Sequence, residues 1–208
     1  MTHPKILLRQ ASATIFAALL PCLGGHAQDR CQAFNLETLP KREVRAVWLT
    51  TLSNLDWPKG YATTQEGIER QKRQLTEILD RYAEANINTV LFQARVRATT
   101  TYPSALEPWD RCLTGQEGRA PGYDPLRFAI EECHKRGMEL HAWLATIPCG
   151  PWTSLGCSRL RAKGLRLRKL DGAGYLDPSD ERVAPYLASV CAELTEKYDI
   201  DGIHLDYI

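Results

Sequence analysis

The stretch DPLRFAIEECHKRGMELHAWL (residues 124–144) holds a helix and a strand whose boundaries are both marked. Asp124 is a typical N-cap, Pro125 suits the first helical position, and Gly137 after two basic residues is typical of a helix end. Helical spacing gives the helix one apolar face, formed by Leu126, Ala129, Ile130 and Cys133. The apolar run 139–144 then predicts a buried β-strand.

The same strand-and-helix pattern repeats on both sides of this unit. Apolar, β-branched runs predict further strands at residues 44–49, 89–96 and 202–208. Strands that alternate with amphipathic helices indicate right-handed βαβ units and a parallel sheet, so the predicted class is α/β. One unit takes roughly 50 residues and eight would need about 400. We therefore expect a (β/α)8 TIM-type barrel truncated to about its first four βα units; a self-contained open four-stranded sheet is the alternative.

Two more helices are predicted between the strands. The first carries an apolar stripe formed by Leu75, Ile78, Leu79 and Tyr82. Thr63 and Glu66 have the spacing of a capping box at its start. The second carries a stripe formed by Val183, Tyr186, Leu187, Val190 and Leu194. We expect this helix to start at Pro185, because proline breaks an interior turn.

The first 27 residues resemble a secretory signal peptide, with a basic start, an apolar stretch and small residues up to Ala27. We expect cleavage near Ala27, an exported protein (periplasmic or secreted), a leader over 28–42 and the barrel segment over 43–208. Cys22 makes a lipoprotein the alternative. No apolar stretch reaches the ~18 to 20 residues that a membrane-spanning helix needs.

The composition is that of an ordinary globular protein, with 44% hydrophobic residues, 25% charged residues and a net charge of +1. It offers no electrostatic footprint for nucleic acid. The seven cysteines match no metal motif, and we expect no cofactor. Most cysteines are expected to be core thiols, and Cys149 with Cys157 is the pair close enough in sequence to suspect a disulfide.

Polar side chains occupy alternate positions of three predicted strands, where barrel enzymes place their reactive groups. The pairs are Gln93 with Arg95, His141 with Trp143, and His204 with Asp206. Members of a pair are two residues apart and so are expected to share a face. We interpret them as the polar floor of a carbohydrate site, with Asp206 near the reacting carbon. The alternative is a buried network that rigidifies the barrel. Asp201, before the last strand, is expected to hold a turn.

The loops after the first three strands each contain a tryptophan, namely Trp57, Trp109 and Trp152. Indole faces stack on sugar rings, although a tryptophan can also simply anchor a long loop. The third loop (145–175) carries a run of basic residues formed by Arg159, Arg161, Lys163, Arg166, Arg168 and Lys169. A solvated face is the expectation for this run, and a clamp for an acidic glycan is the alternative. Leucines that alternate before Asp171-Gly172 predict a small hairpin.

Glycoside hydrolysis usually needs two carboxyl groups that flank the bond. Asp206 is the candidate nucleophile, base or charge stabiliser. Glu107 and Asp110 in the second loop are secondary candidates for the acid. We expect the general acid on a strand beyond Ile208.

A series of motifs runs in order along the chain: EVRAVWLT (43–50), NLDWP (54–58), NTV (88–90), YPS (102–104), EPW (107–109), LTG (113–115), PGYDPL (121–126), HKRGMELHAW (134–143), LDP (176–178) and YDIDGIHLDY (198–207). Together they resemble the bacterial glycosyl hydrolase-like 10 domain. The resemblance implies a TIM-like barrel, export, and activity on bacterial polysaccharide, with peptidoglycan glycan strands as the candidate substrate.

This chain departs from the family pattern at two places. Many members have glycine and aspartate after the arginine of the second strand, where this chain has Ala98 and then Thr99 to Thr101. Many also have paired aspartates where this chain has Asp206 and Tyr207. We predict a glycoside hydrolase-like protein that hydrolyses O-glycosidic bonds of a cell-wall or related polysaccharide, with a polysaccharide or oligosaccharide as its partner. The alternatives are a non-catalytic glycan-binding protein and an inactive fragment of a glycosidase.

Overall fold

The computed structural model describes residues 43–208, so the predicted signal peptide and leader lie outside it. The main sheet is parallel and has the strand order β1-β2-β3-β7. Its strands are β1 (Ala46–Leu49), β2 (Thr89–Arg95), β3 (Glu139–Ala145) and β7 (Gly202–Asp206). The predicted α/β class, the parallel sheet and all four predicted strands are confirmed, with strand ends shifted by at most two residues.

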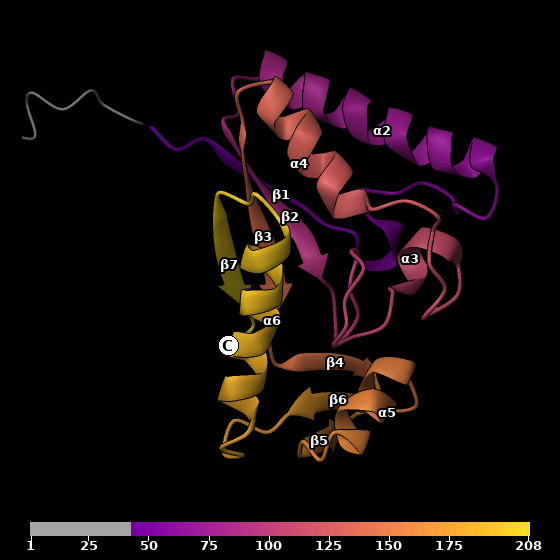
Figure 1. Ribbon diagram of the computed structural model, residues 1–208, viewed down its shortest axis with the longest axis vertical. Helices are drawn as coiled ribbons and strands as arrows, with labels where there is room; N and C mark the ends of the chain where they lie inside the picture. The colour runs from indigo at the N-terminus through magenta and orange to yellow at the C-terminus, as the bar shows by residue number, and fades with distance from the viewer. Residues whose placement is uncertain (1–42) are drawn as a thin grey trace, which may run out of the picture. The chain divides into compact units, whose positions relative to one another are not determined.

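Three helices connect these strands and cover one face of the sheet: α2 (Gln65–Glu84), α4 (Pro125–Lys135) and α6 (Val183–Lys197). Figure 1 shows α2 and α4 side by side, with α6 nearer to β7. The predicted ends of α4 are confirmed, because Asp124 Oδ1 accepts from Arg127 N at 3.1 Å and Gly137 has φ +68°. No helix within residues 43–208 is long and apolar enough to cross a membrane.

Two predicted helix starts are wrong by one or two residues. Thr64, not Thr63, is the N-cap of α2, and its Oγ1 accepts from Gly67 N at 3.2 Å. Gly67 suits this position because a Cβ there would lie 2.4 Å from the carbonyl oxygen of Tyr61. Helix α6 begins at Val183, so Pro185 lies inside the first turn. Proline is tolerated there because first-turn N–H groups have no helical acceptor.

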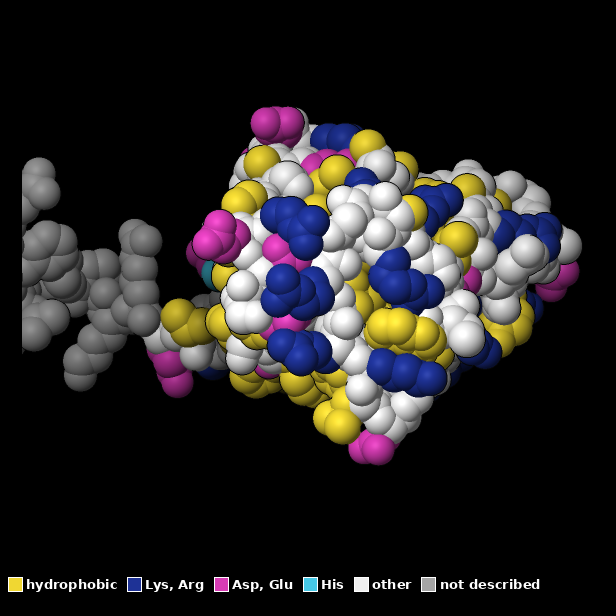
Figure 2. Space-filling model, turned by 90° about the horizontal axis from the view of Figure 1, so that it is seen from below, with side chains coloured by type: hydrophobic (Ala, Val, Ile, Leu, Met, Phe, Trp, Pro, Cys, Tyr) yellow, Lys and Arg dark blue, Asp and Glu magenta, His cyan; other side chains and the backbone are white. Residues whose placement is uncertain are grey.

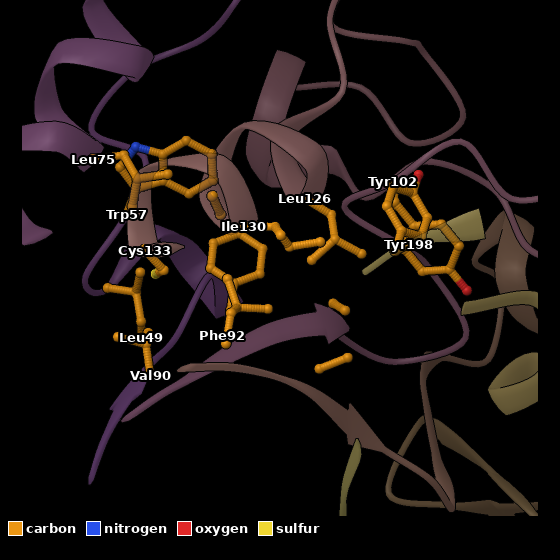
Figure 3. Close-up of a cluster of buried hydrophobic side chains, with 14 of the residues drawn as sticks. Leu49, Trp57, Leu75, Val90, Phe92, Tyr102, Leu126, Ile130, Cys133 and Tyr198 are labelled. Carbon is orange, nitrogen blue, oxygen red and sulfur yellow. The ribbon is translucent and has the colours of Figure 1, made fainter. Parts of the chain in front are cut away.

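A single hydrophobic core fills the space between the helices and the sheet (Figure 3). Leu49 and Phe92 enter it from the strands, and all four residues of the predicted α4 stripe are buried. Trp57 lies in the same core, with its ring centroid 5.9 Å from that of Phe92. The loop after β1 is therefore anchored in the core by its tryptophan.

A second, antiparallel sheet forms in the long loop after β3. It has the order β4-β6-β5, with β4 (Pro148–Pro151), β5 (Leu167–Leu170) and β6 (Ala173–Leu176), and the helix α5 (Leu155–Ala162) follows β4. The predicted hairpin is confirmed: Asp171 and Gly172 have φ +48° and +78° at the turn between β5 and β6. The shorter elements of the other loops are η1 (Leu52–Asn54) and α3 (Arg111–Thr114).

The cysteines that the structure describes are free thiols. Cys149 and Cys157 are buried together in a small core beneath the second sheet, and Cys157 Sγ donates to the carbonyl of Cys149 at 3.2 Å. The suspected pair is thus adjacent in space but reduced. Cys133 is buried on α4, as predicted for a core thiol.

Glu193 on α6 ties the loop after β2 to this helix. Its carboxylate accepts from Ser104 Oγ at 2.5 Å, from Ala105 N at 2.6 Å and from Lys197 Nζ at 2.8 Å. Burial opposes ionisation, but these hydrogen bonds outweigh it and lower the pKa of Glu193 below its ordinary value. The ionised carboxylate therefore stabilises the folded loop.

Glu193→Gln should weaken the dependence of stability on pH. Because the pKa is lowered in the folded state, the carboxylate stabilises the fold above its ordinary pKa of about 4.5, and this contribution is lost as the pH falls through the lowered value. Urea unfolding between about pH 6 and pH 2 should show a steeper loss of unfolding free energy for the wild type than for the variant. Glu196→Gln, an exposed change on the same helix, should keep the wild-type slope. Equal slopes for Glu193→Gln and the wild type would contradict this assignment.

Candidate active site

The face of the main sheet opposite the helices carries polar and aromatic side chains. The register pairs Trp48 with Leu91, Gln93 with Trp143, and Trp143 with His204. Paired residues of parallel strands point to the same face. We call this the open face: Trp48, Leu91, Gln93, His141, Trp143, His204 and Asp206. Five of the predicted site residues therefore lie on one face.

Asp206 ends β7 at the carboxyl edge of the open face. Trp143 Nε1 donates to its Oδ2 at 3.0 Å, and Tyr207 N donates to its Oδ1 at 2.8 Å. The carboxylate is half-buried, so it is oriented by two donors and still reachable from solvent. This arrangement suits a carboxylate that must act in a fixed position.

Trp48 and His204 meet across the open face although they belong to the first and last strands of the sheet. Trp48 Nε1 donates to His204 Nε2 at 3.3 Å, and the two rings pack edge to face at 5.9 Å. The sheet must therefore curl strongly, as in the wall of a barrel. Trp48 is 54% exposed. Trp48 is not among the site residues predicted from the sequence. Its neighbours Val47 and Leu49 pack in the core, so Trp48 between them points to the opposite face of the strand.

His141 lies on the open face beside Gly202, the first residue of β7. Its Nε2 is 3.2 Å from Glu139 Oε2, and its ring packs on Gly202. A Cβ at Gly202 would come within 2.7 Å of the imidazole, so the glycine makes room for the ring. His141 is thus brought to the same face as Asp206 but toward the amino ends of the strands.

Gln93 is buried and holds the loop after β1. Its Oε1 accepts from Thr50 Oγ1 at 2.7 Å, from Thr51 N at 2.9 Å and from Leu52 N at 3.0 Å. Its exposed fraction is 3%, which leaves little surface for a sugar. Gln93 therefore belongs to a buried hydrogen-bond network, which was the alternative to a role in binding carbohydrate.

Arg95 does not share a face with Gln93, so that expectation is wrong. A register shift after Gln93 pairs Arg95 with Leu144, a core residue. The fully buried guanidinium donates to both Glu107 carboxylate oxygens at 2.8 and 2.7 Å and to the carbonyls of Ala145 and Thr146. Burial alone would lower the pKa of Arg95, but the charge of Glu107 outweighs it and the pKa is raised.

The three loop tryptophans are not gathered around one cleft. Trp57 is fully buried and donates to the carbonyl of Gln71 at 2.8 Å, which is the position of a loop anchor. Trp109 is half-buried against the core. Trp152 lies under basic side chains, with Arg161 at 4.5 Å and Lys169 at 5.9 Å from its ring centroid.

The basic run of the third loop forms part of the surface over α5, β5 and β6. Figure 2 views the molecule from this side and shows Lys and Arg side chains gathered there. Two members of the run pair with an acid within the chain: Arg168 and Arg166 lie 2.8 and 3.6 Å from Asp177. Outside the run, Arg182 pairs with Asp180 at 2.8 Å. Hydrogen bonds from Arg182 hold the pKa of Asp180 well below its ordinary value.

The secondary candidates for a general acid have structural partners instead. Glu107 is bound by Arg95 and accepts from Tyr186 Oη at 2.9 Å. Asp110 caps α3 through Cys112 N at 2.7 Å and accepts from Thr99 Oγ1 at 2.5 Å. Asp201 was expected to hold a turn, but its carboxylate instead accepts from Leu140 N of the neighbouring strand β3 at 2.8 Å. Within residues 43–208, no group of three His, Cys, Asp or Glu side chains is placed to hold a metal ion.

Glu107→Gln should strongly destabilise the fold, because it leaves the charge of Arg95 buried without a counterion. Loss of one partner of a buried ion pair costs about 3–5 kcal/mol. Chemical denaturation measures the change, and Glu131→Gln on the exposed side of α4 serves as the matched control. A loss below ~1 kcal/mol would show that the pair does not support the loop after β2.

Two proteins named as glycosyl hydrolases are similar to this chain in sequence. Glycosyl hydrolase DigH of Escherichia coli K12 is 32% identical over 180 residues, which covers 78% of this chain and 41% of that protein. Glycosyl hydrolase YngK of Bacillus subtilis 168 is 33% identical over 181 residues, which covers 79% of this chain and 33% of that protein. The chain thus spans between a third and about two fifths of these relatives.

Similar solved structures are TIM-barrel glycosidases. A glycoside hydrolase family 20 β-N-acetylglucosaminidase superposes with a TM-score of 0.52 at 15% identity, covering 80% of this chain and 36% of that one. The maltogenic α-amylase AmyB of Thermotoga neapolitana gives 0.51 at 14% identity, covering 78% and 38%. These likenesses concern the fold. The model of the glycosyl hydrolase-like 10 family matches residues 43–208, and the chain belongs to that family.

Proposed function

We propose that this protein hydrolyses O-glycosidic bonds of a bacterial cell-wall or related polysaccharide and that Asp206 is one of its two catalytic carboxylates. The observation that carries the proposal is the placement of Asp206. It ends a parallel strand on the open face, oriented by the Trp143 indole, at the edge where barrel enzymes carry their active sites. Membership in a glycosyl hydrolase-like family supports the same reaction class.

Asp206 is proposed to act as nucleophile, as base or by stabilising the positive charge that develops on the sugar ring. Such hydrolysis also needs a general acid to protonate the leaving oxygen. Glu107 and Asp110 are both engaged in structural contacts. We propose that the acid comes from a later strand of a complete eight-stranded barrel, of which residues 43–208 supply about the first four units.

The remaining groups of the open face are proposed to contact the glycan. Trp48 offers an exposed indole ring for stacking on a sugar, and His204 and His141 offer ring nitrogens for hydroxyl groups. Trp143 acts on Asp206 instead of the sugar. The signal-peptide pattern of the first 27 residues supports export to the compartment where such a polysaccharide lies.

Asp206→Asn in the full-length protein should lower the turnover of glycan by at least ~100-fold while the fold is kept, because a positioned catalytic group is lost. Release of new reducing ends measures turnover, and circular dichroism checks the fold. Asp199→Asn, an exposed change before β7, is the matched control. Near-normal turnover of folded Asp206→Asn would refute the assignment. Binding of glycan by the wild type without any new reducing ends would instead indicate a non-catalytic glycan-binding protein.

Trp143→Phe should lower turnover by on the order of 10-fold, because it keeps the aromatic ring but removes a hydrogen bond to a charged acceptor. The same change in the Asp206→Asn background should have much less effect, since the carboxylate that the indole orients is already absent. The two single variants and the double variant form a cycle that measures this coupling. Full additivity of the two losses would place Trp143 outside this contact.

A further inference from the structure

We propose that a cavity between the first three strand-to-helix loops is a subsite for a carboxylate-bearing sugar of the glycan. The inference rests on the proposed function and names the kind of sugar that function acts on. The cavity has a volume of about 650 Å³ and is lined by the loops after β1, β2 and β3. The lining residues used below are Tyr61, Arg97, Asp110, Arg111 and Glu117.

Two of the arginines that line the cavity have no counterion among the described residues. Arg97 and Arg111 are exposed, and neither side chain makes a hydrogen bond or ion pair within residues 43–208. The acidic residues of the cavity are already engaged. Asp110 accepts from Thr99 and Cys112, and Glu117 accepts from the first N–H groups of α5, at 3.1 Å from Leu155 and 2.8 Å from Gly156. Both arginine side chains thus remain available for an incoming anion.

The backbone positions the groups that would contact this sugar. Arg111 is the first residue of α3, and Arg97 has its Cβ packed close to Gly150, where an added Cβ would lie 3.5 Å away. The ring of Tyr61, 48% exposed, rests on Gly115. Gly115 has φ +80°, and a Cβ there would come within 3.1–3.2 Å of the ring. The aromatic face is therefore held at the cavity wall.

These features favour a carboxylate on a sugar ring over other anions. A guanidinium binds a carboxylate through two parallel hydrogen bonds, and a tyrosine ring stacks on the C–H face of a sugar. The volume suits a ligand of one or two sugar rings. Asp110 and Glu117 are also lining residues, and their negative charge would repel a dianionic phosphate more strongly than a singly charged carboxylate.

Calorimetry on the full-length protein tests the proposal with a matched pair of probes. The probes are a tetrasaccharide of the peptidoglycan glycan with its lactyl carboxyl groups free and the same tetrasaccharide with those groups reduced to alcohols. The wild type should bind the acidic probe at least ~10-fold more tightly, as expected for loss of a charge-assisted hydrogen bond. Equal affinity for the two probes, or binding of neither, would overturn the proposal.

Variants then assign the preference to the cavity. Arg97→Gln with Arg111→Gln should remove the preference for the acidic probe and leave affinity for the reduced probe unchanged. Arg73→Gln, an exposed arginine of α2 outside the cavity, should keep the wild-type preference. A preference that persists in the double variant would place the anion site elsewhere. Binding and the release of reducing ends are measured separately, so a wild type that prefers the acidic probe but releases no reducing ends would refute the hydrolase and leave the subsite standing.

Discussion

The alternation of side chains along four parallel strands is the constraint on which the rest of this structure depends. Each strand sends one set of side chains under α2, α4 and α6 and the other set to the open face. The helix-facing set is apolar because only burial of that surface stabilises helices of this length. The open face is thereby free to carry polar and aromatic groups, and the curl of the sheet brings Trp48 to His204.

Buried polar contacts at the carboxyl ends of the strands hold the loops that follow them. Gln93 holds the loop after β1, the pair of Arg95 and Glu107 holds the loop after β2, and Glu193 fixes that loop to α6. Buried polar groups of this kind are stable only when all of their hydrogen bonds are made. None of the described buried side-chain polar atoms lacks a partner. Buried hydrogen bonds with no unsatisfied partner thus hold the loops that surround the proposed site to the sheet and to α6.

The pairing of charged side chains differs between two regions of the surface. Basic side chains over α5, β5 and β6 are partly neutralised by Asp177, and Trp152 lies beneath Arg161 and Lys169. At the cavity between the first three loops, by contrast, the acids cap helices and the arginines stay unpaired. Two arginines near the carboxyl edge of the sheet therefore lack an ion-pair partner within residues 43–208, and the proposed sugar carboxylate would supply one.

The sequence by itself determined the class, the four strands of the main sheet, the three helices that cover it and the hairpin, because these depend on local periodicity and on capping residues such as Asp124. It did not predict α3, α5 or β4, which are short elements inside loops. It also predicts that His141, Trp143, His204 and Asp206 lie on one face of the sheet. Residues two apart in a strand share a face, and parallel pairing of the strands aligns those faces. It could not place Arg95, because one register shift changes the face of a residue and leaves no mark in the local pattern. Nor could it separate Trp57 as a core residue from a tryptophan at the surface. Tertiary packing alone decided which polar and aromatic groups found partners inside the protein, because those partners are distant in sequence.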